Sequence, residues 1–347
     1  MRSIAVLVAI GAISVAPAIT LGQIDTFEDG TIMDWNGDQG TPPANVVTGG
    51  PRGVDDNYIR VFSGIGGAMH NSMYNQFQWT GDWLAAGVNV VEVHVKNDGP
   101  DAVNLRAVWH GQLMARWTST KAVAIPADGV WYKVAFPCRE SDLTKVLVGQ
   151  GGETYSQVMS DVERFMIRHD SGPPSSGGSP VEATVGYDNI EASNKADFQP
   201  YSLTPVRGLQ TGTFFDILFS DDRRISWKPG ITFTTAQAPV EFTVTSYAPT
   251  MTNVTSMTFN LEGHATAPLI RRQIEMRNYT TGLWTVVSPF ANSATSDELI
   301  TVPVAPANYI NPSDGKMEAR IGYKAFGPVF VYPWQARQDR IFFRLTP

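Results

Sequence analysis

Val91-Glu92-Val93-His94-Val95 is the clearest indication of the fold class, because apolar and polar side chains alternate along it. Successive side chains of a β-strand point to opposite faces, so the valines share one face and Glu92 and His94 share the other. The same alternation recurs at residues 103–109 and 131–136, and no long stretch repeats its apolar residues at helical spacing. The sequence therefore predicts an all-β protein.

The second half of the chain contains short alternating segments at regular intervals, separated by turn residues. The segment 278–282, Asn-Tyr-Thr-Thr-Gly, predicts a hairpin between the runs on either side of it. The expected strands are residues 213–219, 224–228, 240–247, 256–261, 269–278, 283–287, 298–302, 317–323 and 340–345. This pattern is typical of an immunoglobulin-like or fibronectin-like β-sandwich.

Residues 1–22 are typical of an export signal. Met1-Arg2 is followed by an apolar run at 4–15 and by small residues suited to cleavage. The run is too short for a membrane span, and no second run of about twenty apolar residues follows it. We therefore expect an exported protein, secreted or at the cell surface, with no membrane span in its mature form.

Three parts are expected after the signal: a first domain at 23–193, a linker at 194–205 and a second domain at 206–347. The linker is placed on a polar segment that contains Pro200 and Pro205. The single cysteine, Cys138, excludes an intramolecular disulfide, which favours a bacterial source and stability from large sandwich cores.

The charge of the chain argues against one class of partner. The formal net charge is −7, and no run of basic residues reaches five. Binding to a phosphate backbone requires clustered Lys and Arg side chains. We therefore expect no nucleic-acid partner.

Acidic residues lie near both ends of the first domain, and they predict a metal site. Asp25 and Glu28 stand in the opening segment Asp25-Thr26-Phe27-Glu28-Asp29-Gly30, and Asp188 stands in the closing strand. If the first and last strands are neighbours, these carboxylates can bind Ca²⁺ as a structural ion, with further ligands from residues 54–58. The alternative is that they are ordinary turn and strand-end residues.

The two segments together resemble the opening and closing segments of jelly-roll carbohydrate-binding modules and galactose-binding-like domains. The closing segment that carries the resemblance is Asp188-Asn189-Ile190. The resemblance implies a jelly-roll β-sandwich for residues 23–193 and a polysaccharide or surface glycan as its ligand.

An aromatic group in the first domain is the candidate sugar platform. Sugar rings stack on aromatic faces, and neighbouring amides orient their hydroxyl groups. The platform is assigned to Tyr74, Asn75, Gln78, Trp79 and Trp83. The alternative is that these large rings fill the core of the sandwich.

Residues 220–224, 272–284 and 323–334 form a combined pattern in the second half of the chain. With this pattern, the second half resembles a β-sandwich domain of unassigned function found in secreted planctomycete-type bacterial proteins. The resemblance implies no activity, and it fits a spacer, an attachment unit or an interaction unit.

Motifs that define common enzyme active sites are absent: the sequence has no G-x-S-x-G, no H-E-x-x-H and no P-loop. We therefore expect a non-catalytic binding protein. One alternative is a structural protein of the bacterial envelope or matrix that binds an envelope protein, for example by strand addition at residues 326–332. Another is a polysaccharide hydrolase or lyase with a carboxylate pair drawn from Glu92, Asp161 and Glu163.

Overall fold

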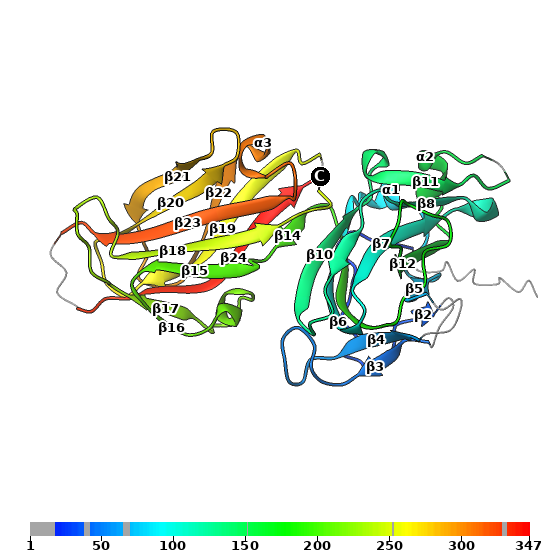
Figure 1. The fold of residues 1–347 in the computed structure, drawn as a ribbon, viewed down its shortest axis with the longest axis horizontal. Helices are drawn as coiled ribbons and strands as arrows, with labels where there is room; N and C mark the ends of the chain where they lie inside the picture. The colour runs from blue at the N-terminus through cyan, green and yellow to red at the C-terminus, as the bar shows by residue number, and fades with distance from the viewer. Residues whose placement is uncertain (1–17, 38–41, 65–69, 151, 252, 328–331) are drawn as a thin grey trace, which may run out of the picture.

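The computed structural model describes residues 18–37, 42–64, 70–150, 152–251, 253–327 and 332–347. Their strands form four antiparallel sheets, which pair into two β-sandwiches that lie side by side (Figure 1). The prediction of an all-β protein built from two sandwiches is confirmed. Most of the signal predicted at 1–22, and residues 328–331 of the predicted edge strand, lie outside the described residues.

The first domain contains two sheets, here called sheet A and sheet B. Sheet A has the order β10-β6-β13-β4-β3, with β1 on β13, and sheet B has the order β11-β8-β7-β12-β5-β2, with β9 on β7. The strands of sheet A are β1 (Ile24–Asp25), β3 (Ala44–Val46), β4 (Tyr58–Ser63), β6 (Val90–Pro100), β10 (Trp131–Pro137) and β13 (Ala183–Ser193). The strands of sheet B are β2 (Asn36–Gly37), β5 (Ser72–Asn75), β7 (Val103–His110), β8 (Arg116–Ser119), β9 (Val123–Ile125), β11 (Leu143–Leu147) and β12 (Arg164–His169).

Short helices connect several strands of the first domain. They are α1 (Trp83–Ala86), η1 (Gln112–Met114), η2 (Glu140–Asp142) and α2 (Tyr155–Met159). The first strand pairs with the last, since Ile24 lies opposite Glu191 and Asp25 lies opposite Ile190. The neighbouring terminal strands assumed for the carboxylate site are therefore present.

The second domain contains sheet C, with the order β16-β17-β24-β19-β22 and β14 on β24, and sheet D, with the order β15-β18-β23-β20-β21. The strands of sheet C are β14 (Ala196–Phe198), β16 (Leu209–Thr211), β17 (Ile225–Lys228), β19 (Ser256–Ala265), β22 (Glu298–Val304) and β24 (Ala336–Thr346). The strands of sheet D are β15 (Ser202–Arg207), β18 (Val240–Tyr247), β20 (Ile270–Asn278), β21 (Leu283–Asn292) and β23 (Lys316–Ala325). The helix α3 (Pro306–Tyr309) follows β22. The predicted hairpin is present, with Asn278 opposite Leu283.

Two predictions for the second domain are wrong. The predicted linker at 194–205 instead supplies β14 and most of β15, which pair with β24 and β18. Pro205 is tolerated in β15 because this strand is at the edge of sheet D, where a missing N–H costs no pairing. The strand predicted at 213–219 is the short 3₁₀ helix η3 (Phe214–Ile217), whose first turn is capped by the Thr213 and Asp216 side chains.

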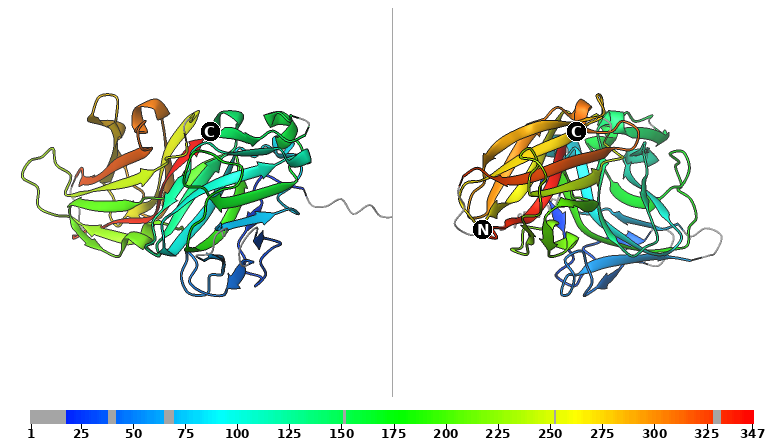
Figure 2. Two further views of the ribbon diagram at one scale, coloured as in Figure 1. Left: turned by 45° about the vertical axis from the view of Figure 1, so that its right-hand side comes forward. Right: turned by 60° about the vertical axis from the view of Figure 1, so that its left-hand side comes forward.

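The outer face of sheet A contacts the second domain, as the further views in Figure 2 also show. Val90 and Ala135 belong to the apolar core of the second domain. Glu92 and His94, which the alternation placed on the polar face of their strand, are buried for the same reason. A polar strand face can therefore be buried when a second domain covers it.

A chain of polar contacts runs across the boundary between the domains, and the bond between Glu92 and Asp197 is its inter-domain link. Glu92 accepts a hydrogen bond from the backbone N–H of Asp197 at 2.6 Å and forms a 2.9 Å ion pair with Lys133. Asp197 in turn binds Arg344 through two hydrogen bonds of 2.6 and 2.7 Å. Among the described residues, no helix has the length and apolar character needed to cross a membrane.

Candidate functional site

The tryptophans of the predicted sugar platform lie in the core, so that prediction is wrong for them. Trp79 and Trp83 are both 0 % exposed. Their rings contact Phe165 with centroids 5.3 Å away in each case, and Trp35 and Trp109 complete the cluster. Because both indole rings are buried between the sheets, neither has a face open to a sugar. Their burial instead stabilises the sandwich.

The other platform residues are divided between the core and the surface. Asn75 is buried, where its Oδ1 accepts the backbone N–H of Phe77 at 2.9 Å and its Nδ2 donates to Met33 O at 3.0 Å. The side-chain amide of Gln78 also donates to Met33 O. The Asn75 and Gln78 amides therefore hold the loop at Met33 in place. Tyr74 lies on the outer face of sheet B, with the Arg164 guanidinium 4.2 Å from the centroid of its ring.

Asp25 is buried and binds two indoles. Its Oδ2 accepts the Nε1–H groups of Trp35 at 2.8 Å and Trp79 at 2.7 Å. Burial raises the pKa of the Asp25 carboxyl, and the two indole hydrogen bonds oppose this effect. The Asp25 carboxyl therefore accepts hydrogen bonds from two core tryptophans. This role is different from that of a metal ligand, which the sequence predicts for Asp25.

The other two predicted metal ligands lie close to a third carboxyl group, that of Asp56. Burial, and then the charges of Asp56 and Glu28, raise the pKa of Asp188 to about 8. The Asp56 pKa is also raised, by burial and by a side-chain hydrogen bond with Glu28. Within the described ranges, however, no three His, Cys, Asp or Glu side chains are arranged to hold a metal ion.

Among the carboxylates suggested for a hydrolase or lyase, Glu92 does not lie with the other two. Glu92 lies on sheet A and is bound by Lys133 and the Asp197 backbone. Asp161 and Glu163 are exposed and precede β12 of sheet B, and Asp161 accepts a hydrogen bond from Gln112 at 3.1 Å. Glu92 is therefore on the opposite sheet of the sandwich from the other two.

A cleft of about 730 Å³ lies between the two domains. This volume is within the range of small-molecule and saccharide pockets, roughly 300–1,000 Å³. The first domain contributes residues 123–126, 128 and 130–134 to the wall, and the second contributes residues 199–201, 214, 215, 218, 246, 247, 249 and 314. The cleft is mostly apolar, with a few polar groups at its edge.

Three tyrosines in contact with one another form part of the aromatic lining of the cleft, which also includes Trp131, Phe214 and Phe215. Tyr132 and Tyr201 stack at 6.0 Å between centroids with their planes 17° apart, and Tyr247 meets Tyr201 edge to face at 5.5 Å. Tyr201 is 56 % exposed and Tyr247 is 38 % exposed. Tyr132 comes from β10 of the first domain, whereas the other two come from the second domain. The domains therefore form this surface jointly.

Polar groups beside the tyrosines are held by hydrogen bonds. The Tyr132 hydroxyl donates to Asp128 Oδ2 at 2.6 Å, and burial together with Asp128 raises the Tyr132 pKa, so this phenol stays protonated. Gln199 donates to Leu218 O at 2.8 Å, and Ser246 donates to Gln199 O at 2.7 Å. This arrangement offers aromatic faces and fixed polar atoms, with the carboxyl group of Asp128 on one wall of the cleft and that of Asp314 on the other.

No local sequence pattern marks this cleft, because its three tyrosines are far apart along the chain. Tyr132 lies within a predicted strand, Tyr201 was assigned to the linker, and Tyr247 ends another strand. Their meeting depends on how sheet A contacts the second domain. Only a prediction of that contact could have identified them.

No protein-family model matches the chain, and no curated protein matches its sequence. Among solved structures, a tandem of two family 22 carbohydrate-binding modules from Paenibacillus barcinonensis Xyn10C is 14 % identical, with a TM-score of 0.31 over 94 % of this chain and 99 % of that one. A family 11 carbohydrate-binding module from Clostridium thermocellum, in complex with a β-1,3-1,4-mixed-linked tetrasaccharide, is 12 % identical, with a TM-score of 0.32 over 50 % of this chain and 96 % of that one.

An exo-β-agarase is similar over half of this chain, with 12 % identity and a TM-score of 0.36. The matched region spans 25 % of the agarase chain. With TM-scores below 0.5, these similarities do not identify the fold or the function of this chain.

Proposed function

We propose that the protein is an exported, non-catalytic binding protein that holds a saccharide chain in the cleft between its domains. One observation carries the proposal: Tyr132, Tyr201 and Tyr247 line a cleft of about 730 Å³. An exposed phenol ring presents a flat apolar face to the C–H groups of a sugar, as in other aromatic recognition surfaces. Asp128, Gln199 and Ser246 stand beside the rings to bind hydroxyl groups.

The experiment is a glycan array together with pull-down on insoluble polysaccharides, using residues 23–347. Tyr201→Ala removes the central ring and is expected to weaken binding by roughly ten- to thirtyfold, in line with losing one stacked aromatic contact. Phe233→Ala is the matched control, because Phe233 is 87 % exposed and lies outside the cleft lining.

The outcomes separate the alternatives. Saturable binding that Tyr201→Ala weakens and Phe233→Ala leaves unchanged supports the cleft. Equal loss in both variants, or no binding to any glycan, counts against it and favours an envelope protein as the partner.

We also propose that Ca²⁺ stabilises the first domain near Glu28, Asp56 and Asp188. The proximity of these carboxyl groups, which adds to burial in raising the pKa of Asp188 and of Asp56, supports a cation that would offset their repulsion. Because no three of the described side chains are arranged as metal ligands, backbone carbonyl oxygens would have to complete the coordination. Calcium is expected to raise the melting temperature of the native chain and to have a smaller effect on Asp188→Asn. An equal rise in both proteins would remove Asp188 from the site.

A further inference from the structure

The loop at residues 229–239, here called the end loop, closes one end of the second sandwich. It connects β17 of sheet C to β18 of sheet D. β18 runs from Val240 to Tyr247, and Tyr247 lies in the tyrosine cleft beside the first domain (Figure 1). The end loop precedes Val240, so it lies at the opposite end of the second domain from the cleft.

The end loop contains no charged residue and exposes two large apolar side chains. Ile231 is 79 % exposed and Phe233 is 87 % exposed. Hydrogen bonds nevertheless hold the loop in a defined turn, since the Phe233 backbone N–H donates to Gln237 Oε1 at 2.8 Å and the Gly230 N–H donates to Pro239 O at 2.7 Å. Contact of these apolar side chains with water is unfavourable, so a partner that covers both of them would be favoured.

Three basic side chains flank the end loop, and none of them forms an ion pair within the described ranges. Lys228 ends β17 directly before the loop, whereas Arg271 and Lys324 are partners in register on β20 and β23. The Lys324 ammonium also donates to Thr235 O within the loop. Carboxylates at this end of the sandwich are paired with other cations: Glu241 with Arg207, Asp297 with Arg224 and Glu298 with Arg272. An excess of positive charge therefore surrounds the end loop.

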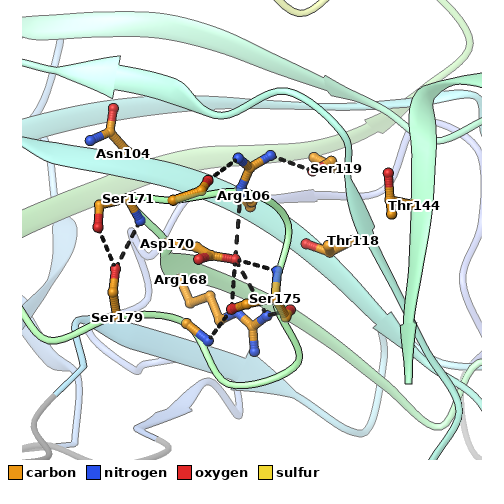
Figure 3. A network of polar contacts seen from close by, with 12 residues as sticks. Asn104, Arg106, Thr118, Ser119, Thr144, Arg168, Asp170, Ser171, Ser175 and Ser179 are labelled. Atoms are coloured by element: carbon orange, nitrogen blue, oxygen red, sulfur yellow. Dashed lines mark hydrogen bonds and ion pairs between the residues drawn. The ribbon is translucent and has the colours of Figure 1, made fainter. Parts of the chain in front are cut away.

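Basic residues on sheet B of the first domain differ in this respect, because a loop of the chain itself binds them. Arg106 and Arg168 donate hydrogen bonds to carbonyl groups of the loop 170–180 (Figure 3). The Asp170 carboxylate lies 3.7 Å from the first guanidinium and 3.8 Å from the second. Among the described residues, no carboxylate plays the part of Asp170 beside the end loop, so its cations are open to a partner from outside the chain.

We propose that the end loop binds the surface of a lipid bilayer that contains anionic lipids. Ile231 and Phe233 enter the boundary between head groups and acyl chains, where exposed apolar side chains are favoured. The flanking cations contact the lipid phosphate groups, and this complementary charge selects an anionic surface. A second copy of the chain fits less well, because a two-fold contact through the same loop brings like charges together. The proposal does not rest on glycan binding in the cleft.

The test is co-sedimentation of residues 23–347 with vesicles of phosphatidylglycerol and phosphatidylcholine, and with vesicles of phosphatidylcholine alone. Phe233→Ala is expected to weaken binding to the anionic vesicles by roughly ten- to a hundredfold, because one large apolar side chain is no longer buried. Lys228→Gln is expected to weaken it about fivefold, and this effect should shrink at high salt. Leu283→Ala is the matched control, since Leu283 is 66 % exposed and pairs with the other end of β20 from Arg271.

Each outcome has one meaning. Binding to the anionic vesicles that Phe233→Ala weakens and Leu283→Ala leaves unchanged supports the proposal. No binding to the anionic vesicles, equal weakening by these two variants, or equal binding to the uncharged vesicles overturns it. Self-association without vesicle binding that Phe233→Ala abolishes assigns the end loop to a second copy and also overturns it. Tyr201→Ala should leave vesicle binding unchanged, which separates a failure of this surface from a failure of the cleft.

Discussion

The two hydrogen bonds to Asp25 predict a large and specific loss of stability in Trp79→Phe. The variant keeps an aromatic ring in the core but removes the Nε1–H that donates to Asp25 at 2.7 Å. A hydrogen bond to a charged group is worth about 1.5–3 kcal/mol, and the smaller ring adds about 1 kcal/mol of lost packing. The expected loss in the free energy of unfolding is therefore about 2.5–4 kcal/mol.

Trp83→Phe is the matched control within the same cluster. Trp83 is also 0 % exposed, but its Nε1 has no hydrogen-bond partner among the described residues. The substitution should therefore cost only packing, about 1 kcal/mol, and it removes a buried donor that was not satisfied. The difference between the two variants isolates the bond to Asp25.

Urea unfolding followed by far-ultraviolet circular dichroism measures both variants without depending on tryptophan fluorescence. If Trp79→Phe and Trp83→Phe differ by less than about 0.5 kcal/mol, the Asp25 bond does not stabilise the core as argued. If Trp79→Ala keeps full stability and loses glycan binding, the ring is at the surface, and the sugar platform first predicted from the sequence is restored.

Three further substitutions test other parts of the structure. Lys133→Met leaves the buried Glu92 carboxylate without its ion-pair partner at 2.9 Å. The free energy of unfolding in urea should fall by about 3–5 kcal/mol. A loss below about 1 kcal/mol would contradict a stabilising role for the ion pair. Gly186→Ala places a Cβ 3.0 Å from the Tyr58 ring and 3.1 Å from the Trp131 ring. The variant should therefore destabilise the first domain by about 1–3 kcal/mol, measured by thermal unfolding. An unchanged melting temperature would contradict the close packing. Burial and the charges of Arg116, Arg164 and Arg168 lower the His110 pKa to about 3, so the folded state disfavours the protonated ring and stability should fall as pH drops from about 6.5 towards 3. His110→Gln should flatten that part of the stability–pH curve, and an identical curve would count against the buried, neutral imidazole.

The strands were largely predictable from the sequence, because alternation records which side chains face a core. Residues 240–247 and 298–302 were predicted as strands and lie within β18 and β22. The linker was not predictable by the same reasoning. Its prolines indicate a break in most strands, but Pro205 lies in an edge strand, where no hydrogen-bond partner is lost.

The role of single aromatic residues was not predictable. Trp79 lies in the connection between β5 and α1, where no alternation indicates which way a side chain points. Tyr201 appeared to be part of a polar connection, and its ring meets Tyr132 only because the two sandwiches are in contact. Glu92 shows the same limit, since the pattern marks a polar face but does not show whether water or a second domain covers it.

The composite walls of the cleft have an evolutionary consequence. Only Asn194 and Lys195 separate β13 of one sandwich from β14 of the other. Gene recombination that moved either domain alone would leave half of the tyrosine surface behind. The two sandwiches are therefore expected to be inherited as a single unit, and substitutions at Tyr132 should be under joint selection with those at Tyr201.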